Sequence, residues 1–355
     1  MGKKIRTAVV GVGNCCSAFT QAVHYYALAG NSLEGIPNPD IRGYKLGDIE
    51  LVAAFDIDKR KVGRDLSEAI FAAPNNYDKV CEVPYAGVRV VKGPVLDGAT
   101  GMLAGAILLS DEPEADVVSV LKESRTEVLV NLLPAGAEEA SRFYAEASLK
   151  AGCGFINATP TAIACDPRYA RRFEEAGLPL VGDDLMSQIG GTVLHKKLLE
   201  FLVERGVKVM HTYQLDVGGS LETYNTLEPS RRALKRAVKT DAIESILPYN
   251  AEIVAGTTDY VDFLKNSRVS YYWIEGRYFL GAPFEIDIYL RTADAPNCCS
   301  VLFDSIRGVK VALERRIGGP LISLCAYGYK RAPVKGKTDE ALRWFREFIE
   351  GKRER

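Results

Sequence analysis

The sequence predicts an α/β protein in which a Rossmann-type, doubly wound parallel sheet is joined to a second α+β domain for catalysis and oligomerisation. In the first half, short apolar β-branched runs alternate with amphipathic stretches, which is typical of a parallel sheet covered on both faces. After about residue 186 this alternation ends, and 355 residues exceed one ordinary core. We therefore expect a dinucleotide-binding domain at 1–186 with 296–355, and a catalytic and oligomerisation domain at 187–295.

The expected elements follow from the apolar periodicity in chain order. Strands are expected at 4–13, 49–58, 127–134, 153–160 and 178–184, and helices at 16–30, 59–71, 138–152 and 166–177. The second half predicts a long helix at 187–206, a strand at 207–219 and an antiparallel hairpin at 271–292. A helix at about 297–316 is expected to return to the first domain, and 336–355 to include a short amphipathic helix.

The composition argues against nucleic-acid-binding, membrane-spanning and secreted proteins. A net charge of −1 gives no bulk attraction to nucleic acid or to an anionic membrane, so neither is expected as a partner. No apolar run reaches the roughly 18 residues that span a bilayer. The apolar run near the N-terminus is short and lacks the small-residue cleavage pattern of a signal peptide. We therefore expect a cytoplasmic protein.

The cysteines and histidines do not predict a metal centre or a hydrolase. The eight cysteines lack the spacing of zinc ligands. The adjacent pairs Cys15–Cys16 and Cys298–Cys299 are expected to be small buried side chains in a reducing compartment, with redox sensing as the alternative. No histidine has a serine or cysteine partner that the sequence establishes, so a Ser–His hydrolase is not supported.

A glycine-containing loop links the first expected strand to the first helix. Gly11 permits a tight turn, and Gly13 lets the backbone approach a pyrophosphate at the positive end of the helix dipole. A cysteine stands where a third glycine is usual, so the helix is expected slightly further from its strand. A plain tight turn is the alternative. Cofactor contacts are expected from Gly11, Val12, Gly13, Asn14, Cys15 and Cys16.

Asp56 ends the second long strand in the block AAFDID. A carboxylate there binds both ribose hydroxyls and repels a 2′-phosphate, so NAD is favoured over NADP. Asp56 follows Gly13 by 43 positions, whereas the simple motif has about 20. We place the excess in an inserted loop at 30–48. The alternative for Asp56 is an ordinary turn at the end of a strand.

Two further strand ends are expected at the same edge of the sheet. The loop 131–136 and the run 182–184 both follow strands, and ligands of open parallel sheets lie beyond the carboxyl ends of the strands. Adjacent carboxylates in the second run can orient an ammonium, a metal or a substrate hydroxyl, and a helix N-cap is the alternative. Further cofactor contacts are therefore expected from Leu133, Pro134, Ala135, Pro160, Asp183 and Asp184.

The segment 231–239 carries five positive charges. If it is helical, Lys235 and Lys239 lie one turn apart on one face. Two neighbouring ammonium groups make a phosphate clamp and lower each other's proton affinity. A solvated basic face is the alternative.

Several blocks then occur in order along the chain: VGVGNC, AAFDIDKRKVGRDLSEAI, LLPAGAEEA, NATPTAIACDP, VGDDLMSQIG, LDVGGS, IEGR, ADAPN and IGGP. Through them the chain resembles the myo-inositol-1-phosphate synthase family, closest to its short bacterial form, from about residue 5 to 332. The resemblance implies an NAD cofactor, a sugar-phosphate substrate, a homotetramer and a role in inositol and phospholipid biosynthesis. It leaves open whether a divalent metal or a monovalent cation assists.

The resemblance also implies a redox-neutral closure of a hexose phosphate to a cyclitol phosphate. In that chemistry NAD⁺ oxidises C5 of glucose 6-phosphate, the ketone acidifies C6, the enolate attacks C1 in an internal aldol step, and the NADH formed reduces the ketone. Lysines hold the phosphate, stabilise oxyanions and move protons. The alternatives are the same chemistry on a ketose phosphate such as fructose 6-phosphate, a simple NAD-linked dehydrogenase, and a non-catalytic NAD-binding regulator.

Carried over by position, the resemblance assigns the catalytic residues and marks departures. The expected catalytic residues are Lys235, Lys239, Arg268, Asp294 and Lys330. The expected substrate contacts are Ser220, Glu222, Lys235, Lys239, Arg268 and Lys330. Arg268 stands where the family has an essential lysine, and arginine cannot release a proton near neutral pH. Met186 replaces another lysine, and Ser220 and Glu222 replace Asn and Asp. These departures indicate a related but different sugar phosphate, or a rearranged site.

The segment from 222 to 249 is also expected to act as a lid. Its positive charges repel one another, and it has few large apolar residues. We therefore expect it to be mobile with NAD alone and to fold over a bound sugar phosphate.

Overall fold

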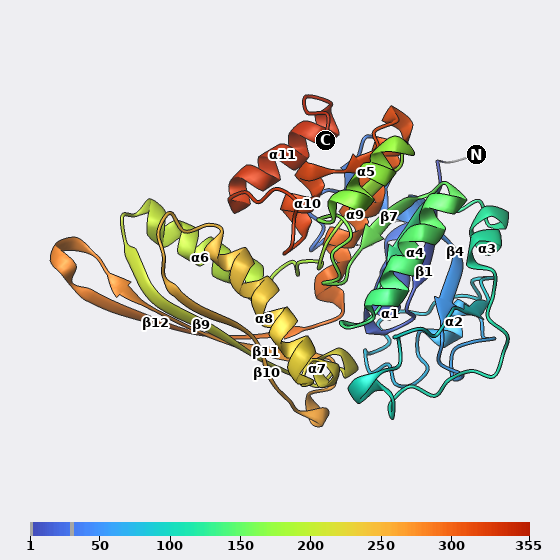
Figure 1. Cartoon of the computed structure of the whole chain (residues 1–355), viewed down its shortest axis with the longest axis horizontal. Coiled ribbons are helices and arrows are strands. Elements are labelled where there is room, and N and C mark those ends of the chain that lie inside the picture. The colour runs from blue at the N-terminus through green and yellow to red at the C-terminus, as the bar shows by residue number, and fades with distance from the viewer. Residues whose placement is uncertain (1–2, 29–31) are drawn as a thin grey trace.

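The computed structural model describes residues 3–28 and 32–355. A seven-stranded sheet has the order β13-β8-β7-β6-β1-β4-β5, and every neighbouring pair is parallel. Its strands are β1 (Ile5–Val10), β4 (Ile49–Asp56), β5 (Val90–Lys92), β6 (Val128–Asn131), β7 (Gly154–Asn157), β8 (Pro179–Val181) and β13 (Gly319–Pro320). This confirms the predicted Rossmann-like sheet (Figure 1).

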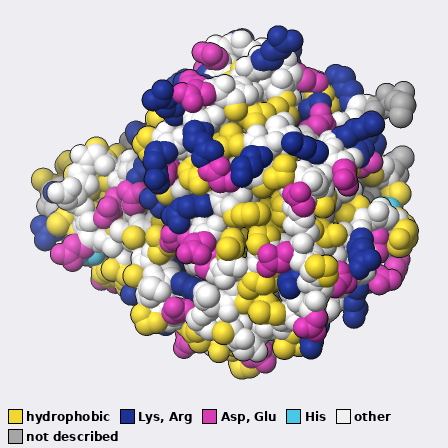
Figure 2. All heavy atoms as spheres, turned by 45° about the vertical axis from the view of Figure 1, so that its right-hand side comes forward, with side chains coloured by type: hydrophobic (Ala, Val, Ile, Leu, Met, Phe, Trp, Pro, Cys, Tyr) yellow, Lys and Arg dark blue, Asp and Glu magenta, His cyan; other side chains and the backbone are white. Residues whose placement is uncertain are grey.

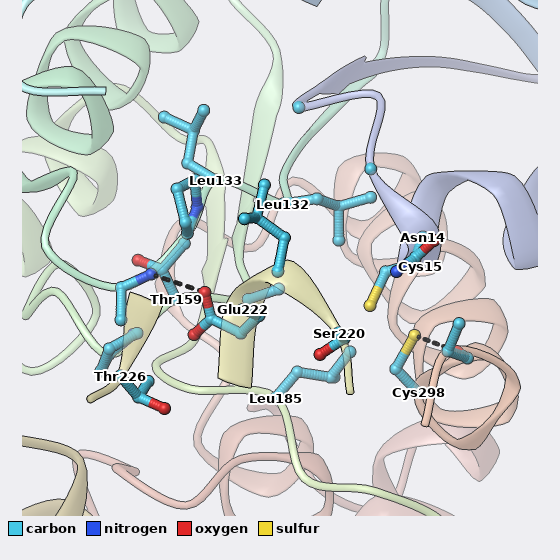
Figure 3. A pocket seen from close by; sticks show the side chains of 18 of the residues that line it. Asn14, Cys15, Leu132, Leu133, Thr159, Leu185, Ser220, Glu222, Thr226 and Cys298 are labelled. Atoms are coloured by element: carbon cyan, nitrogen blue, oxygen red, sulfur yellow. Dashed lines mark hydrogen bonds between the residues drawn. The ribbon is translucent and has the colours of Figure 1, made fainter. Parts of the chain in front are cut away.

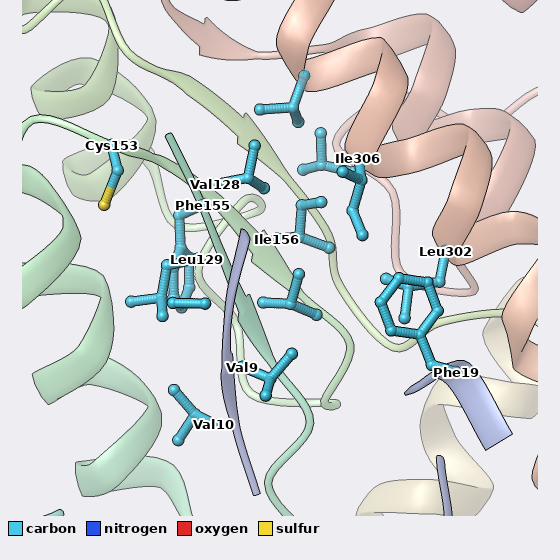
Figure 4. Packing of buried hydrophobic residues seen from close by; sticks show 14 of the residues in the cluster. Val9, Val10, Phe19, Val128, Leu129, Cys153, Phe155, Ile156, Leu302 and Ile306 are labelled. Atoms are coloured by element: carbon cyan, nitrogen blue, oxygen red, sulfur yellow. The ribbon is translucent and has the colours of Figure 1, made fainter. Parts of the chain in front are cut away.

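Helices cover both faces of this sheet. They are α1 (Asn14–Ala27), α2 (Leu66–Ala69), α3 (Val117–Glu123), α4 (Glu138–Ala151), α5 (Pro167–Glu175) and α9 (Cys299–Arg315). In Figure 4, Leu129 and Phe155 point to one side of the sheet, whereas Ile156 points to the other side, toward Ile306 of α9. Because α9 also contacts β1, β6, β7 and β8, the predicted return of this helix to the first sheet is confirmed.

Local signals explain where several of these helices begin and end. The α4 helix ends at Gly152, whose φ of 80° is the left-handed conformation that glycine adopts most readily. Asp166 caps α5 by accepting a hydrogen bond from the backbone N–H of Arg168. Strands β6 and β7 are buried along their whole length, as expected for a sheet covered on both faces.

The expected helix at 59–71 is wrong in extent. Only Leu66–Ala69 is helical, because the carboxylate of Asp58 accepts the N–H of Arg60 and Gly63 has a φ of 87°. The insertion at 30–48 contains a small hairpin of β2 (Asp40–Ile41) and β3 (Tyr44–Lys45), and its residues 30–31 lie outside the described residues.

A second sheet of four strands has the order β10-β9-β11-β12. Its strands are β9 (Lys208–Gly218), β10 (Glu252–Tyr260), β11 (Ser267–Arg277) and β12 (Pro283–Ala293). Helices α6 (Gly191–Glu204) and α8 (Pro229–Glu244) pack on one of its faces (Figure 1). The hairpin of β11 and β12 is confirmed, whereas β10, which pairs in parallel with β9, was not predicted.

The remaining helices are short or lie at the C-terminal end. They are α7 (Leu221–Asn225), α10 (Ile322–Gly328) and α11 (Thr338–Glu350). The rings of Tyr327 and Phe345 stack at 4.7 Å between α10 and α11, and α11 confirms the predicted amphipathic tail. None of the helices in the described part of the chain is long and apolar enough to cross a membrane. Figure 2 shows basic and acidic side chains interspersed on one face of the molecule.

Candidate active site

A single cavity runs from the carboxyl ends of the central strands of the first sheet to the charged residues of the second sheet. It is lined by the loop after β1, by the end of β4 and by the loop after β6. On the opposite side it is lined by residues of α7, α8 and β11 and by the segments around Asp294 and Lys330. In Figure 3, Asn14 and Cys15 lie on one wall, and Ser220 and Glu222 on the wall formed by α7.

The glycine loop presents backbone donors to this cavity. Gly11 has a φ of 86°, and a Cβ there would lie 2.9 Å from the carbonyl oxygen of Leu132, so only glycine fits. The α1 helix begins after Gly13 without a side-chain cap, and a Cβ on Gly13 would meet nothing within 4 Å. The first N–H groups of α1 are therefore open to an anion.

The six residues expected from this loop divide into two groups. Gly11, Gly13, Asn14 and Cys15 line the cavity, whereas the buried side chains of Val12 and Cys16 belong to the core. Asn14 accepts the N–H groups of Asn76 and Tyr77 at 2.8 and 3.1 Å, so its side chain shapes the loop. The prediction that Cys16 places α1 slightly further from β1 than a glycine would is not tested and stays a prediction.

Asp56 lies at the end of β4 and lines the cavity. Its carboxylate accepts the backbone N–H of Val12 at 2.8 Å, of Ile57 at 2.7 Å and of Asp58 at 2.9 Å. The ammonium of Lys61 is 3.8 Å away. Asp56 therefore holds the glycine loop and keeps limited accepting capacity for ribose hydroxyls. Lys61, which sequence reasoning did not single out, is a second polar group at this end.

The loop after β6 joins the two ends of the cavity. Leu133, Pro134 and Ala135 line it, as does Pro160 after β7. The N–H of Ala135 donates to Glu222 Oε2 at 3.3 Å, and the carbonyl of Ala135 accepts from Asn225 at 2.8 Å. The loop expected to touch the cofactor thus also binds α7.

The two adjacent aspartates after β8 have different surroundings. Asp183 is buried, and its carboxylate accepts from Asn157 and from the N–H groups of Ile163, Ala164 and Cys165. Burial raises the pKa of Asp183 to about 6 despite these bonds. Since Asp183 does not line the cavity, the structure does not support it as a cofactor contact. It fixes the turn that follows β7.

Asp184 does line the cavity and carries charge there. Lys330 Nζ donates to Asp184 Oδ1 at 2.8 Å and to the carbonyl of Leu185 at 2.8 Å. Lys235 Nζ lies 3.9 Å from the same Oδ1. Asp184 Oδ2 is buried without a hydrogen-bond partner in the described part of the chain. Burial would raise the pKa of Asp184, but Lys330 and Lys235 outweigh it and lower the pKa.

The two lysines beside Asp184 differ in proton affinity. Burial lowers the pKa of Lys330 to about 8, and Lys235 and Lys239 add to this effect while Asp184 opposes it. For Lys235, burial is outweighed by Asp184 and Glu222, which raise its pKa above the usual range. Lys235 Nζ lies 3.1 Å from Glu222 Oε1. Lys330 is therefore the better proton carrier near neutral pH, and Lys235 is a fixed charge.

Arg268 and Lys239 form a second charged group. Arg268 holds Asp294 through two contacts, of 2.9 Å from Nε and 3.0 Å from Nη2. Lys239 pairs with Asp216, and Arg268 Nη1 lies 3.9 Å from Asp216 Oδ2. Arg268, Lys239 and Asp294 line the cavity, and the catalytic roles that the resemblance implies for them stay predictions. Asp216 was not predicted, because its neighbours Leu215 and Val217 are apolar and this alternation predicts that the polar side chain faces solvent, whereas it is 1% exposed.

The other departures from the family pattern have distinct surroundings. Ser220 caps α7 by accepting the N–H of Thr223 at 3.3 Å, and both Ser220 and Glu222 line the cavity. Met186 is buried and lies outside the cavity wall, although its neighbours Leu185 and Ser187 contribute to it. A lysine at 186 would therefore need to redirect its side chain to reach a ligand.

The reasons given for a mobile lid at 222–249 are wrong. The α8 helix buries Val238, Ala242 and Ile243, and Ile246 joins the core of the second sheet. The ammonium groups of its lysines are paired with carboxylates, so the charges do not need a bound anion. The mobility itself stays a prediction that hydrogen exchange would test.

Asn75 and Asn76 are two further contributors that the sequence did not single out. Asn75 Nδ2 donates to the carbonyl of Val12 at 3.0 Å, and Asn76 Nδ2 donates to that of Gly219 at 3.0 Å. They connect the glycine loop to the end of β9. In the described ranges, no group of three or more His, Cys, Asp or Glu is arranged to hold a metal ion, so the cation requirement stays open.

The fold and cavity define a dinucleotide-binding α/β protein with a second, lysine-rich site for an anionic ligand. Residues 190–295 match the family model described as myo-inositol-1-phosphate synthase. The chain is 42% identical to the inositol-3-phosphate synthase of Mycolicibacterium smegmatis, over 98% of each protein. The chain therefore belongs to the myo-inositol-1-phosphate synthase family.

Two solved structures support the fold assignment. A myo-inositol-1-phosphate synthase-related protein from Thermotoga maritima matches with a TM-score of 0.82 over 98% of each chain, at 22% identity. The structure of a protein named Ari2 matches with a TM-score of 0.79 at 32% identity, over 98% of this chain and 99% of that one.

Proposed function

We propose that this protein is an NAD-dependent inositol-3-phosphate synthase that converts glucose 6-phosphate to an inositol phosphate in the cytoplasm, without net oxidation. The observation that carries this proposal is the joining of two sites in one cavity. An uncapped helix N-terminus with a carboxylate at the neighbouring strand end lies at one end, and four cations lie at the other. Full-length relatives at 40–42% identity bear the same activity in their names.

The residues at the first end fit NAD. Gly11 makes room for the loop, the N–H groups at the start of α1 receive the pyrophosphate, and Asp56 with Lys61 faces the ribose. Bound NAD supplies an acceptor for the hydrogen at C5 of the sugar and later returns it. The loop at Leu133, Pro134 and Ala135 and the residue Pro160 complete this half of the cavity.

The charged residues at the second end fit a sugar phosphate and its developing oxyanions. Lys235, kept protonated by Asp184 and Glu222, holds the phosphate. Arg268 and Lys239 provide fixed positive charge for the oxygen that becomes an enolate. Lys330, with a pKa of about 8 that is lowered chiefly by burial, takes a proton from the carbon beside the ketone, since part of it is neutral near pH 7.5.

The second sheet supports self-association to a homotetramer. One face is covered by α6 and α8, and no described element covers the other face (Figure 1). That face carries Tyr213, Tyr271 and Trp273, with ring centroids 5.4–6.0 Å apart, and Tyr289 is 61% exposed. An uncovered sheet face with clustered aromatic side chains marks an interaction surface. Light scattering should give the mass of four chains, and a monomer at micromolar concentration would contradict the proposal.

Product identification tests the proposed reaction. The protein is incubated with catalytic NAD and with glucose 6-phosphate or fructose 6-phosphate in parallel, and phosphorus and carbon NMR follow the products. The proposal expects an inositol phosphate from glucose 6-phosphate. A five-membered carbocycle from fructose 6-phosphate alone would favour the ketose alternative instead. That alternative is supported by Arg268, which replaces the family's lysine and is engaged by two carboxylates.

A further inference from the structure

Asp216 of β9 lies behind the charged end of the cavity and does not line it. It is 1% exposed, and it contacts both cations that face the ligand space from this side. Lys239 forms an ion pair with Oδ2, and Arg268 Nη1 lies 3.9 Å from the same oxygen. Removing a carboxylate from water is costly unless it is paired, so a role in holding these cations accounts for its position.

Neutral donors fix the orientation of this carboxylate. Ser270 Oγ donates to Asp216 Oδ1 at 2.6 Å, and Gln214 Nε2 lies 2.9 Å from each of the two oxygens. Gln214 and Ser270 belong to β9 and β11, which are paired strands of the second sheet. The carboxylate is therefore attached to a rigid sheet, and its charge is directed to the cations.

The charge on Asp216 is permanent over the working pH range. Burial raises its pKa, but Lys239 and Arg268 outweigh burial and hold the pKa at about 2. Arg268 is also bound by Asp294 on the cavity side. Its guanidinium is thus held between one carboxylate behind it and one in front.

We propose that Asp216 is a positioning residue, which sets the places of Lys239 and Arg268 without touching the substrate. The proposal rests on the proposed function, since those two cations are the ones assigned to the enolate oxygen. Without the charge on Asp216, Lys239 and Arg268 repel each other at close range. The flexible lysine then turns away from the cavity, because the arginine stays bound to Asp294.

The test compares Asp216→Asn, which keeps the shape of the side chain, with Asp259→Asn on the exposed side of β10 as the matched control. Calorimetry with NAD present measures the affinity for glucitol 6-phosphate, an open-chain hexitol phosphate that cannot cyclise. NMR measures kcat for glucose 6-phosphate. We expect Asp216→Asn to bind glucitol 6-phosphate at least 10-fold more weakly and to lower kcat about 100-fold, while the control stays within 3-fold of the parent.

A double-mutant cycle separates positioning from a general structural effect. If Asp216 acts through Lys239, adding Asp216→Asn to Lys239→Gln should cost less than 3-fold in binding and in kcat. Losses that multiply in the double variant would overturn the proposal, as would an Asp216→Asn protein within 3-fold of the parent. Should Asp216→Asn fail to fold, Ser270→Ala is expected to weaken binding 3- to 10-fold, and an unchanged affinity would overturn the proposal.

Failure of the proposed function gives a different result. A parent protein that binds glucitol 6-phosphate but forms no inositol phosphate contradicts the proposed reaction. The role of Asp216 is then tested by the double-mutant cycle on binding alone. A parent protein that forms inositol phosphate, with Asp216→Asn unaffected in both measurements, contradicts only the role of Asp216.

Discussion

The two ends of the cavity are lined by different kinds of chemical group. The cofactor end consists mainly of backbone N–H groups, one carboxylate and small or apolar side chains from loops of the first sheet. The sugar-phosphate end consists of long charged side chains, which come from α8, β11 and the segments around Asp294 and Lys330. The first end depends on backbone shape, and the second on the pairing of charges.

This difference determines how each end meets its ligand. The N–H groups at the start of α1 have no side-chain cap, so a bound anion can accept their hydrogen bonds. At the other end, each cation already has a carboxylate partner. The pairs are Lys235 with Glu222, Lys330 with Asp184, Lys239 with Asp216, and Arg268 with Asp294. A sugar phosphate must therefore share or exchange these partners.

The largest expected effect comes from removing a charge at the second end. Lys235→Met should lower kcat about 10²–10³-fold, because a preorganised positive charge is lost. The affinity for NAD should stay within about 3-fold of the parent if the two ends are independent. Steady-state rates and NAD calorimetry measure both, with Lys122→Met on the exposed side of α3 as the control. An equal loss of NAD affinity would show that the ends are not separable.

The corresponding change at the first end should show the reverse pattern. Asp56→Asn should weaken NAD binding by about 1.5–3 kcal/mol, because hydrogen bonds to a charged group are lost. Binding of glucitol 6-phosphate should change little. The parent should prefer NAD to NADP, and calorimetry that gives equal affinities for the two cofactors would refute the assignment of Asp56 to the ribose.

The pH dependence of kcat/KM tests Lys330, because this ratio reports the pKa values of the enzyme without substrate. Its pKa in the folded protein is lowered to about 8, chiefly by burial, and a base must be neutral. The ratio should therefore rise about 10-fold per pH unit below pH 8 and level off above it. Lys330→Arg should abolish this rise of kcat/KM with pH and most of the activity, because arginine keeps its proton. A parent profile that is flat between pH 6 and 9 would exclude Lys330 as the base.

The smallest expected effect concerns the departure at Arg268. If this residue tunes the site for another sugar phosphate, Arg268→Lys should raise the rate with glucose 6-phosphate relative to fructose 6-phosphate by a few fold. Met186 is outside the cavity wall, so Met186→Lys should add little. A parent that already prefers glucose 6-phosphate and is only damaged by Arg268→Lys would show that this departure does not set specificity.

The same contrast explains what could be predicted from the sequence. The glycine loop and the strand ends are local features, so Gly11, Asp56 and the loop at 131–136 were placed at one edge of the sheet correctly. Asp183 and Asp184 look alike in the sequence. Only the tertiary structure separates them, because the turn at 163–165 uses the carboxylate of Asp183.

The charged end was less accessible to prediction. Arg268 and Lys330 lie far in the chain from the neighbouring pair Lys235 and Lys239, so only the resemblance to a family brings the four residues together. Asp216 could not be predicted, because the apolar residues on either side of it indicate a solvent-facing position, whereas the structure buries its carboxylate against Lys239 and Arg268. Strand β10 was also missed, since its polar and glycine residues at 256–259 interrupt the apolar alternation.

The most direct test of the account is the fate of the hydrogen at C5. Glucose 6-phosphate that carries deuterium at C5 is converted by the protein with an excess of unlabelled NAD, and the product is examined by NMR and mass spectrometry. If oxidation, ring closure and reduction all occur before the substrate or NADH dissociates, the inositol phosphate retains the deuterium. Absorbance at 340 nm then does not rise steadily. Deuterium that accumulates in NADH, with an oxidised sugar phosphate as the product, would contradict the account.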